Sequence, residues 1–302
     1  GVNMGTACTP RLSDSPTIDL QAGEYAVAIA PRVGSSISAF TFRNEPILRT
    51  AVGRSVLDSA CFPLVPFSNR IANSRFVFED MPVQLSPNHP EETDDPVLHG
   101  FGWLGEWSLE ESGGDTASLV FQHKADRWPW HFRARSGFHL DADGLLLTLE
   151  LVNRDERPMP AGLGFHPYFP RTPRTNYRGL HRGEWRAGSD CLPLTLEERA
   201  APIDWWAGNP VGSRRVDTVY TGRQGNLEIL WPERGLAAVV EPSDNLSFTT
   251  VYVPGGEDFF CVEPVSHVTN VFNTGRPADG MRVLAPGESL MVSMRIGARA
   301  ID

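Results

Sequence analysis

The stretch FHLDADGLLLTLELVN, residues 138–153, has the pattern of an antiparallel hairpin. Two apolar runs flank the turn residues Asp141 to Gly144, and an Asp-Gly pair between such runs favours a tight turn. In the second run, Thr148 and Glu150 stand between leucines in the period-two alternation of a strand with one buried face. The stretch therefore predicts two neighbouring antiparallel strands.

Similar segments recur along the whole chain. The 28 glycines and 25 prolines separate short alternating or apolar runs that are typical of strands, among them EYAVAIA, SISAFTF, RFVFED, ASLVFQH, NLEILW, LAAVVEP and LSFTTVYV. No long amphipathic helix is evident, and residues 192–208 (LPLTLEERAAPIDWWAG) hold at most one short helical piece. We predict an all-β fold, a large antiparallel β-sandwich, with residues 1–302 in a single domain.

The composition excludes several classes of partner. The 27 Lys and Arg residues against 37 Asp and Glu give a net charge of −10, which argues against a nucleic-acid partner. No apolar run has the 18 or so residues of a membrane span, and the first ten residues lack a signal-peptide pattern. The single cysteines at positions 8, 61, 191 and 261 are typical of reduced thiols. We expect a cytoplasmic monomer or homodimer without a nucleic-acid or membrane partner.

Two titratable residues each precede a proline inside apolar surroundings. Glu263 follows Phe259-Phe260-Cys261-Val262 and comes before Pro264 in FFCVEP, where alternation puts Phe259, Cys261 and Glu263 on one face. Because Pro264 removes a ladder N–H, we expect the strand to end at Glu263. His166 likewise precedes a proline in AGLGFHPYFPR. The two form a plausible acid and base pair, although a structural role is the commoner reason for such a residue.

Four further polar residues are candidates for ligand contacts. Asn69 and Arg70 lie in FPLVPFSNRI, where the guanidinium offers a fork of donors to hydroxyl groups or to an anion. His99 precedes a glycine in VLHGFGW, and Asp217 stands between apolar residues in RRVDTVY. A surface ion pair for Arg70, a loop histidine and a turn-capping aspartate are the alternatives.

Taken together and in this order, these motifs resemble the aldose 1-epimerase (mutarotase) family. The resemblance runs from about residue 20 to the C-terminus and depends on PFSNRI, LHGFGW, GFHPYF, VDTVY and FFCVEPVSHVTNVFN. It implies a galactose mutarotase-like supersandwich and an isomerase that interconverts the α and β anomers of an aldohexose. It also implies that the reaction needs no cofactor and no metal ion.

The resemblance also implies roles for the individual residues. His166 corresponds to the acid that protonates the sugar ring oxygen, and Glu263 to the base that takes the anomeric proton. Asn69, Arg70, His99 and Asp217 correspond to residues that contact the sugar. We expect burial to raise the pKa of Glu263 and nearby carboxylates to keep His166 protonated. Pro170 stands where many members have Asn, a departure that bears on sugar preference.

Alternative interpretations remain open at this stage. The same fold can serve as a non-catalytic sugar-binding module, or the substrate can be a hexose 6-phosphate, for which Arg54, Arg75 and Arg171 are available as phosphate ligands. A glycosidase would use Asp217 and Glu263 as its two carboxylates. A metal site would use His99, His166 and His181, a set without ligand spacing to support it. The candidates for an aromatic side chain that stacks on the sugar ring are Phe169, Trp206, Tyr252 and Phe272.

Overall fold

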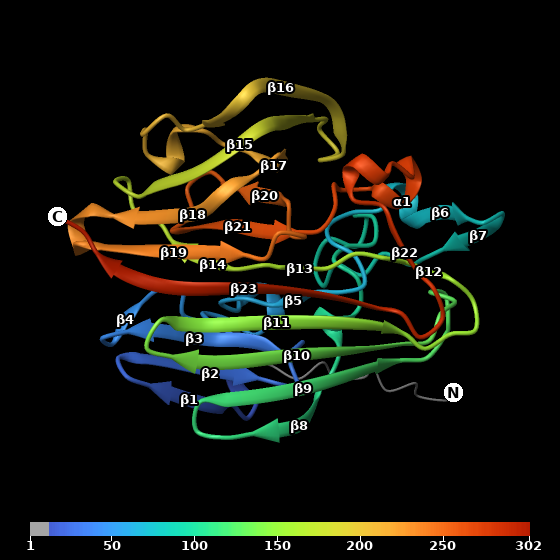
Figure 1. The fold of residues 1–302 in the computed structure, drawn as a ribbon, viewed down its shortest axis with the longest axis horizontal. Helices are drawn as coiled ribbons and strands as arrows, with labels where there is room; N and C mark the ends of the chain where they lie inside the picture. The colour runs from blue at the N-terminus through green and yellow to red at the C-terminus, as the bar shows by residue number, and fades with distance from the viewer. Residues whose placement is uncertain (1–11) are drawn as a thin grey trace.

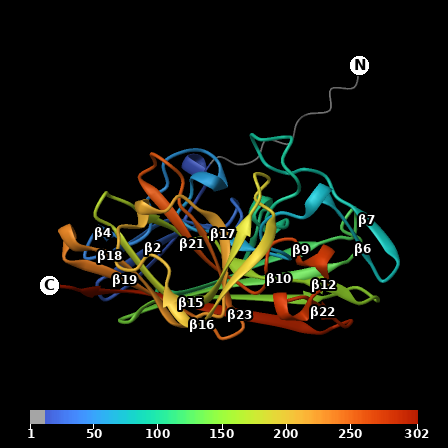
Figure 2. The same cartoon turned by 90° about the horizontal axis from the view of Figure 1, so that it is seen from above.

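The computed structural model describes residues 12–302, which form a nearly all-β protein dominated by one large antiparallel sheet (Figure 1). A smaller sheet forms a second layer against one end of the large one (Figures 1 and 2). The predicted fold class, an all-β antiparallel sandwich, is therefore confirmed.

The predicted hairpin lies in this large sheet as β10 (Phe132–Asp141) and β11 (Gly144–Asn153), with Asp141 opposite Gly144. The Asp143 N–H donates to Asp141 Oδ1 at 2.8 Å and closes the turn. Gly144 has a φ of +120°, and a Cβ atom there would lie 2.3 Å from the carbonyl oxygen of Ile296. Only glycine fits this turn without strain. Buried residues alternate along both strands, as the sequence predicts.

The large sheet joins strands that are far apart in the sequence. β21, near the end of the chain, pairs with β13 and β14 on one side and with β20 on the other. The sheet has fifteen strands. Across the sheet they are β5 (Pro63–Leu64), β13 (Gly164–Phe165), β21 (Phe259–Val265), β20 (Phe248–Tyr252), β17 (Asp217–Thr221), β15 (Asn176–Ala187), β18 (Gln224–Trp231), β19 (Leu236–Pro242), β23 (Ser289–Ala300), β11, β10, β9 (Thr116–His123) and β8 (Ser108–Ser112), with β14 (Tyr168–Pro170) beside β21 and β16 (Pro193–Asp204) beside β15.

The second layer is a four-stranded sheet that packs on the β8–β11 end of the large sheet. Its strands are β1 (Ile18–Ala22), β2 (Tyr25–Ala30), β3 (Ser36–Phe42) and β4 (Glu45–Pro46). β1 and β2 contact β10, and Val27 and Phe40 share one buried cluster with Leu140 and Leu147. Burial of these apolar faces is the main force that holds the layers together.

Short elements complete the chain. β6 (Arg75–Phe78) and β7 (Met81–Gln84) form a hairpin, and β12 (Met159–Ala161) pairs with the distant β22 (Arg282–Leu284). The helical turns are η1 (Leu12–Asp14), η2 (Val56–Asp58), η3 (Ala72–Ser74), η4 (Gly102–Leu104), η5 (Val211–Ser213), η6 (Pro232–Arg234), α1 (Val271–Thr274) and η7 (Pro277–Asp279). Over residues 12–302, none of these helices has the length and hydropathy needed to cross a membrane. Cys61, Cys191 and Cys261 are free thiols, as expected, and Cys8 lies outside the described residues.

One stretch lacks the short helix that the sequence allowed, and one local prediction is wrong. Residues 192–208 hold no helical piece, because the strand β16 pairs with β15 along most of this stretch. The strand that carries Glu263 continues through Pro264 to Val265. On that edge of β21, β14 pairs with residues 259–261 and β13 with Val265, so Pro264 lies where the edge has no partner. A strand tolerates a missing N–H at such a position.

Candidate functional site

All six candidate site residues line one cavity of about 350 Å³. This volume is in the range of small-molecule sites. The predicted residues in its wall are Asn69, Arg70, His99, His166, Asp217 and Glu263, and the other lining residues are Leu57, His89, Glu91, Glu92, Leu98, Tyr168, Tyr252 and Phe259. The fold thus brings together residues that are up to about two hundred positions apart in the sequence.

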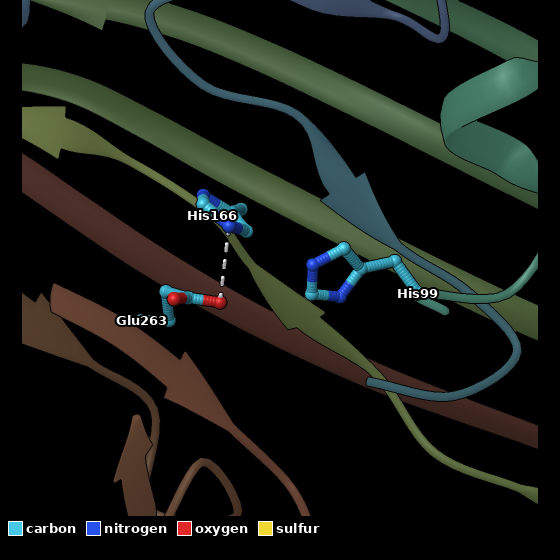
Figure 3. Close-up of side chains that lie close together, drawn as sticks. All are labelled: His99, His166 and Glu263. Atoms are coloured by element: carbon cyan, nitrogen blue, oxygen red, sulfur yellow. Dashed lines mark ion pairs between the residues drawn. The ribbon is translucent and has the colours of Figure 1, made fainter. Parts of the chain in front are cut away.

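His166 and Glu263 face each other at the base of the cavity (Figure 3). His166 lies between β13 and β14, Glu263 lies on β21, and both short strands pair with β21. His166 Nε2 is 3.5 Å from Glu263 Oε1, and the two residues are 5% and 2% exposed. Phe260 and Val262 point into the main core, as strand alternation predicts, while Phe259 and Glu263 line the cavity.

Burial shifts the protonation of this pair in opposite directions. Burial and the nearby charge of Asp217 raise the pKa of Glu263 well above its usual value, against the opposing effect of Arg70. Burial, together with the charge of Arg49, lowers the pKa of His166 to about 3. The expected raised pKa of Glu263 is therefore found, but the expectation of a readily protonated His166 is wrong. Both shifts favour a neutral imidazole beside a protonated carboxyl group over an imidazolium beside a carboxylate.

The Asn-Arg and His-Gly motifs are hydrogen-bonded to each other. The Asn69 N–H donates to His99 Nδ1 at 3.0 Å, and the His99 N–H donates to the Asn69 carbonyl oxygen at 3.0 Å. A Cβ atom on Gly100 would lie 2.1 Å from the carbonyl oxygen of Val65, so the position after His99 requires glycine. Figure 3 shows the His99 ring pointing toward His166 and Glu263. This exchange of hydrogen bonds fixes both motifs at the cavity wall.

The hydrogen bond from Asn69 also decides which nitrogen of His99 carries its proton. Burial, with the charges of His166 and Arg70, lowers the pKa of His99 well below its usual value, so the ring is neutral. Because Nδ1 accepts from a backbone N–H, the proton of the neutral ring is on Nε2. His99 therefore offers the cavity a hydrogen-bond donor.

Three of these side chains also form a possible metal-ligand set. His99, His166 and Glu263 place one ligand atom each within 4.8 Å of one another. Two imidazoles and a carboxylate suit a divalent transition metal. A ligating nitrogen must present a lone pair, however, and the tautomer of His99 leaves an N–H at Nε2. The alternative ligand His181 lies elsewhere, where its Nε2 is 2.8 Å from Thr249 Oγ1.

Arg70 and Asp217 lie on the cavity wall away from the core. Arg70 donates to Asn69 Oδ1 at 3.3 Å and to Asp95 Oδ2 at 3.4 Å, which holds the guanidinium at the wall. Asp217 begins β17, two strands from Glu263. Burial raises the pKa of Asp217, against the charge of Arg70 and a hydrogen bond from Cys191.

Sequence reasoning missed several residues of the site. The segment with His89, Glu91 and Glu92 contributes to the cavity wall, and no motif in the sequence indicates this. Phe259 could have been identified, because it shares the face of Glu263 on β21. Among the four aromatic residues considered for stacking, Tyr252 lines the cavity, and the others are buried in the core, namely Phe169, Trp206 and Phe272.

Comparison with known proteins supplies the family. A family model described as Aldose 1-epimerase matches residues 16–297, nearly the whole chain. The chain belongs to the aldose 1-epimerase family. Family membership indicates mutarotase-type chemistry on a small-molecule sugar.

Individual relatives agree with this assignment. The chain is 36% identical to the uncharacterised protein YphB of Escherichia coli (strain K12) over 278 residues, which cover 87% of this chain and 92% of that protein. A crystal structure of an Escherichia coli K12 protein provisionally assigned as an aldose 1-epimerase superposes with a TM-score of 0.84 at 30% identity, over 95% of this chain and 99% of the other. A galactose mutarotase-like protein from Clostridium acetobutylicum has a TM-score of 0.84 at 20% identity, over 96% of each chain, and shows the shared fold.

Proposed function

We propose that the protein is an aldose 1-epimerase that interconverts the α and β anomers of an unphosphorylated aldohexose. The observation that carries the proposal is the buried pair of His166 Nε2 and Glu263 Oε1, 3.5 Å apart at one cavity. Mutarotation needs an acid and a base at one sugar, since one oxygen of the anomeric carbon gains a proton while the other loses one.

The proposed reaction conserves the single proton of the pair. Glu263 as carboxylate takes the proton of the anomeric hydroxyl while protonated His166 gives its proton to the ring oxygen, and the C1–O5 bond breaks. The aldehyde turns about the C1–C2 bond and closes from its other face. His166 then takes back its proton from the O5 hydroxyl, and Glu263 returns its proton to O1. These two side chains supply all the proton transfers, so the proposed mechanism is independent of a cofactor.

Because the pKa of His166 is low, sugar binding must also favour protonation of His166. Burial favours the proton on Glu263, whereas the proposed first step starts with a carboxylate and an imidazolium. Hydrogen bonds from bound hydroxyl groups, and from the Nε2–H of His99, would stabilise the carboxylate. We propose that the bound sugar in this way moves the proton from Glu263 to His166.

The charges around the cavity support an uncharged sugar over a hexose 6-phosphate. Arg70 lines the cavity, and its guanidinium is already paired with Asp95. Glu91 and Glu92 add negative charge to the wall. The arginines considered for phosphate do not line the cavity, and Arg171 donates to the carbonyl oxygens of Glu257 and Pro254. A phosphate group would therefore meet net repulsion.

The test is a panel of aldoses and aldose 6-phosphates followed by NMR for accelerated anomer exchange. We expect acceleration with one or more neutral aldohexoses and kcat/KM at least about tenfold lower for the matching 6-phosphate, the equivalent of about 1.4 kcal/mol. Binding of a sugar without faster exchange would favour the non-catalytic module. A preference for the phosphate would contradict the charge argument.

A further inference from the structure

The imidazole of His166 is held in a stack of aromatic rings. The ring centroid of Phe62 is 4.4 Å from that of His166 with planes at 23°, and that of Tyr168 is 4.8 Å away with planes at 28°. The centroids of Phe62 and Tyr168 are 6.3 Å apart, so these two rings do not lie on opposite sides of the imidazole. The guanidinium carbon of Arg49 is 3.8 Å from the centroid of the Tyr168 ring and 4.7 Å from that of Phe259. Tyr168 is therefore the ring that contacts both His166 and the cation of Arg49.

Arg49 is itself fixed by the backbone. The guanidinium of Arg49 donates to the carbonyl oxygens of Leu57 at 2.8 Å and of Ser59 at 2.6 Å. The backbone N–H of Arg49 donates to the Tyr168 carbonyl oxygen at 2.9 Å. These acceptors are uncharged, and none of the ion pairs recorded over residues 12–302 includes Arg49. The positive charge therefore acts on the stack without a neutralising partner in contact.

We propose that Arg49 is a positioning residue for the acid–base pair: it fixes Tyr168, and hence the plane of the His166 ring, and its charge opposes protonation of that ring until sugar binds. This role rests on the proposed function. A ring that is neutral before sugar binds forms no ion pair with Glu263, so the sugar does not have to break one.

Other titratable groups also face His166. Glu263 on β21 favours the protonated ring, whereas His99 and Arg49 oppose it when charged. Cys61 lies two residues before β5 with its thiol near the backbone of His166, and Tyr168 lies on β14. Burial raises the pKa of Cys61 and of Tyr168, which keeps both uncharged at neutral pH. Arg49 is therefore the permanently charged group of this set.

The test compares Arg49→Gln, which keeps amide donors but loses the charge, with Arg49→Lys, which keeps the charge but loses the planar group. From the two stacking distances the guanidinium lies at most about 9 Å from the imidazole, where a unit charge shifts a pKa by about one unit at an effective dielectric constant of 20. We expect the acid limb of the kcat/KM profile to move up by about one pH unit in Arg49→Gln and to stay in place in Arg49→Lys. NMR titration of ¹⁵N-labelled His166 should show the same shift.

Arg43→Met is the matched control, since Arg43 lies 4.8 Å from the centroid of the Phe42 ring on the surface and should leave the profile unchanged. Superimposable profiles for wild type and Arg49→Gln, or equal shifts in the Gln and Lys variants, would overturn the proposal. If Arg49→Gln does not fold, Tyr168→Leu removes the intervening ring, and an unchanged kcat would then contradict the role. A wild-type protein without mutarotase activity refutes the proposed function, while the NMR titration still reports on Arg49.

Discussion

Glu184 and Glu263 are two glutamates that are equally buried, at 2% exposure, in different surroundings. Glu184 on β15 accepts from Arg214 at 2.6 Å and from the hydroxyl of Tyr220, so its charge is paired and hydrogen-bonded. Glu263 Oε1 has no hydrogen-bond partner within the described part of the chain. A buried carboxyl group without a hydrogen-bond partner lowers the stability of the fold. Such a group therefore indicates a role other than packing.

Two buried histidines differ in the same way. His181, 1% exposed, has Nε2 2.8 Å from Thr249 Oγ1, and burial with the charge of Arg223 lowers its pKa to about 3. His166 has no partner at Nδ1 among residues 12–302, and its Nε2 faces Glu263 at 3.5 Å. The comparison distinguishes two kinds of buried titratable group. Glu184 and His181 are hydrogen-bonded within the fold, whereas Glu263 and His166 each have a polar atom without a partner at the cavity.

The largest expected effect comes from replacing the two glutamates by glutamine. In Glu263→Gln we expect kcat to fall by about 10²–10⁴-fold, the usual loss for a positioned proton-transfer group, with folding intact. In Glu184→Gln we expect activity to stay within about threefold and the unfolding free energy to fall by about 3 kcal/mol, because Arg214 loses its buried ionic partner. Polarimetry of fresh α-glucose or α-galactose and urea denaturation measure the two effects. Equal activity losses in the two variants would remove the distinction.

The histidines sharpen the comparison with a somewhat smaller effect. His166→Asn should lower kcat by about 10²-fold or more, since the ring oxygen loses its proton donor. His181→Asn should instead lower stability by about 1–3 kcal/mol through its lost hydrogen bonds and leave kcat near that of wild type. Anomer exchange measured by NMR, with melting temperatures for both variants, gives the two results. Full activity in His166→Asn would show that another group donates the proton.

The smallest effect is on the pH dependence of stability. Because the folded-state pKa of Glu263 is raised above its usual value of 4.5, the folded protein keeps a proton that the unfolded chain releases above that pH. The contribution of this group is therefore present below pH 4.5 and is lost as the pH rises toward the folded-state pKa. Relative to wild type, Glu263→Gln should gain unfolding free energy as the pH rises from 5 to 7. A difference that stays constant over this range would mean that Glu263 is ionised in the folded protein.

Local patterns predicted the features that depend on few residues. The turn at Asp141 to Gly144 has local determinants, because the Asp143 N–H donates to Asp141 Oδ1 and Gly144 has a positive φ that glycine tolerates. The placement of Glu263 and Phe259 on one face follows from strand alternation alone. The proline-flanked motifs suggested His166 and Glu263 as an acid and base pair, and the family resemblance added a role for each residue toward the sugar.

Features that depend on packing between distant segments could not be predicted. Asp95 pairs with Arg70 across 25 positions, and Arg49 reaches His166 only through Tyr168. The stretch 192–208 has helix-forming residues but lies beside β15, whose backbone groups it pairs with. The pKa of His166 depends on how completely Phe62 and Tyr168 exclude water from its ring, which is a property of the folded core.

A crystal structure of Glu263→Gln with the aldohexose that the wild type turns over tests most directly whether one pyranose bridges the pair. We expect a single sugar in the cavity, with its anomeric oxygen about 3 Å from the side chain at position 263 and its ring oxygen about 3 Å from His166 Nε2. A sugar bound outside the cavity, or one whose anomeric carbon faces Asp217 instead, would contradict the proposed roles of His166 and Glu263.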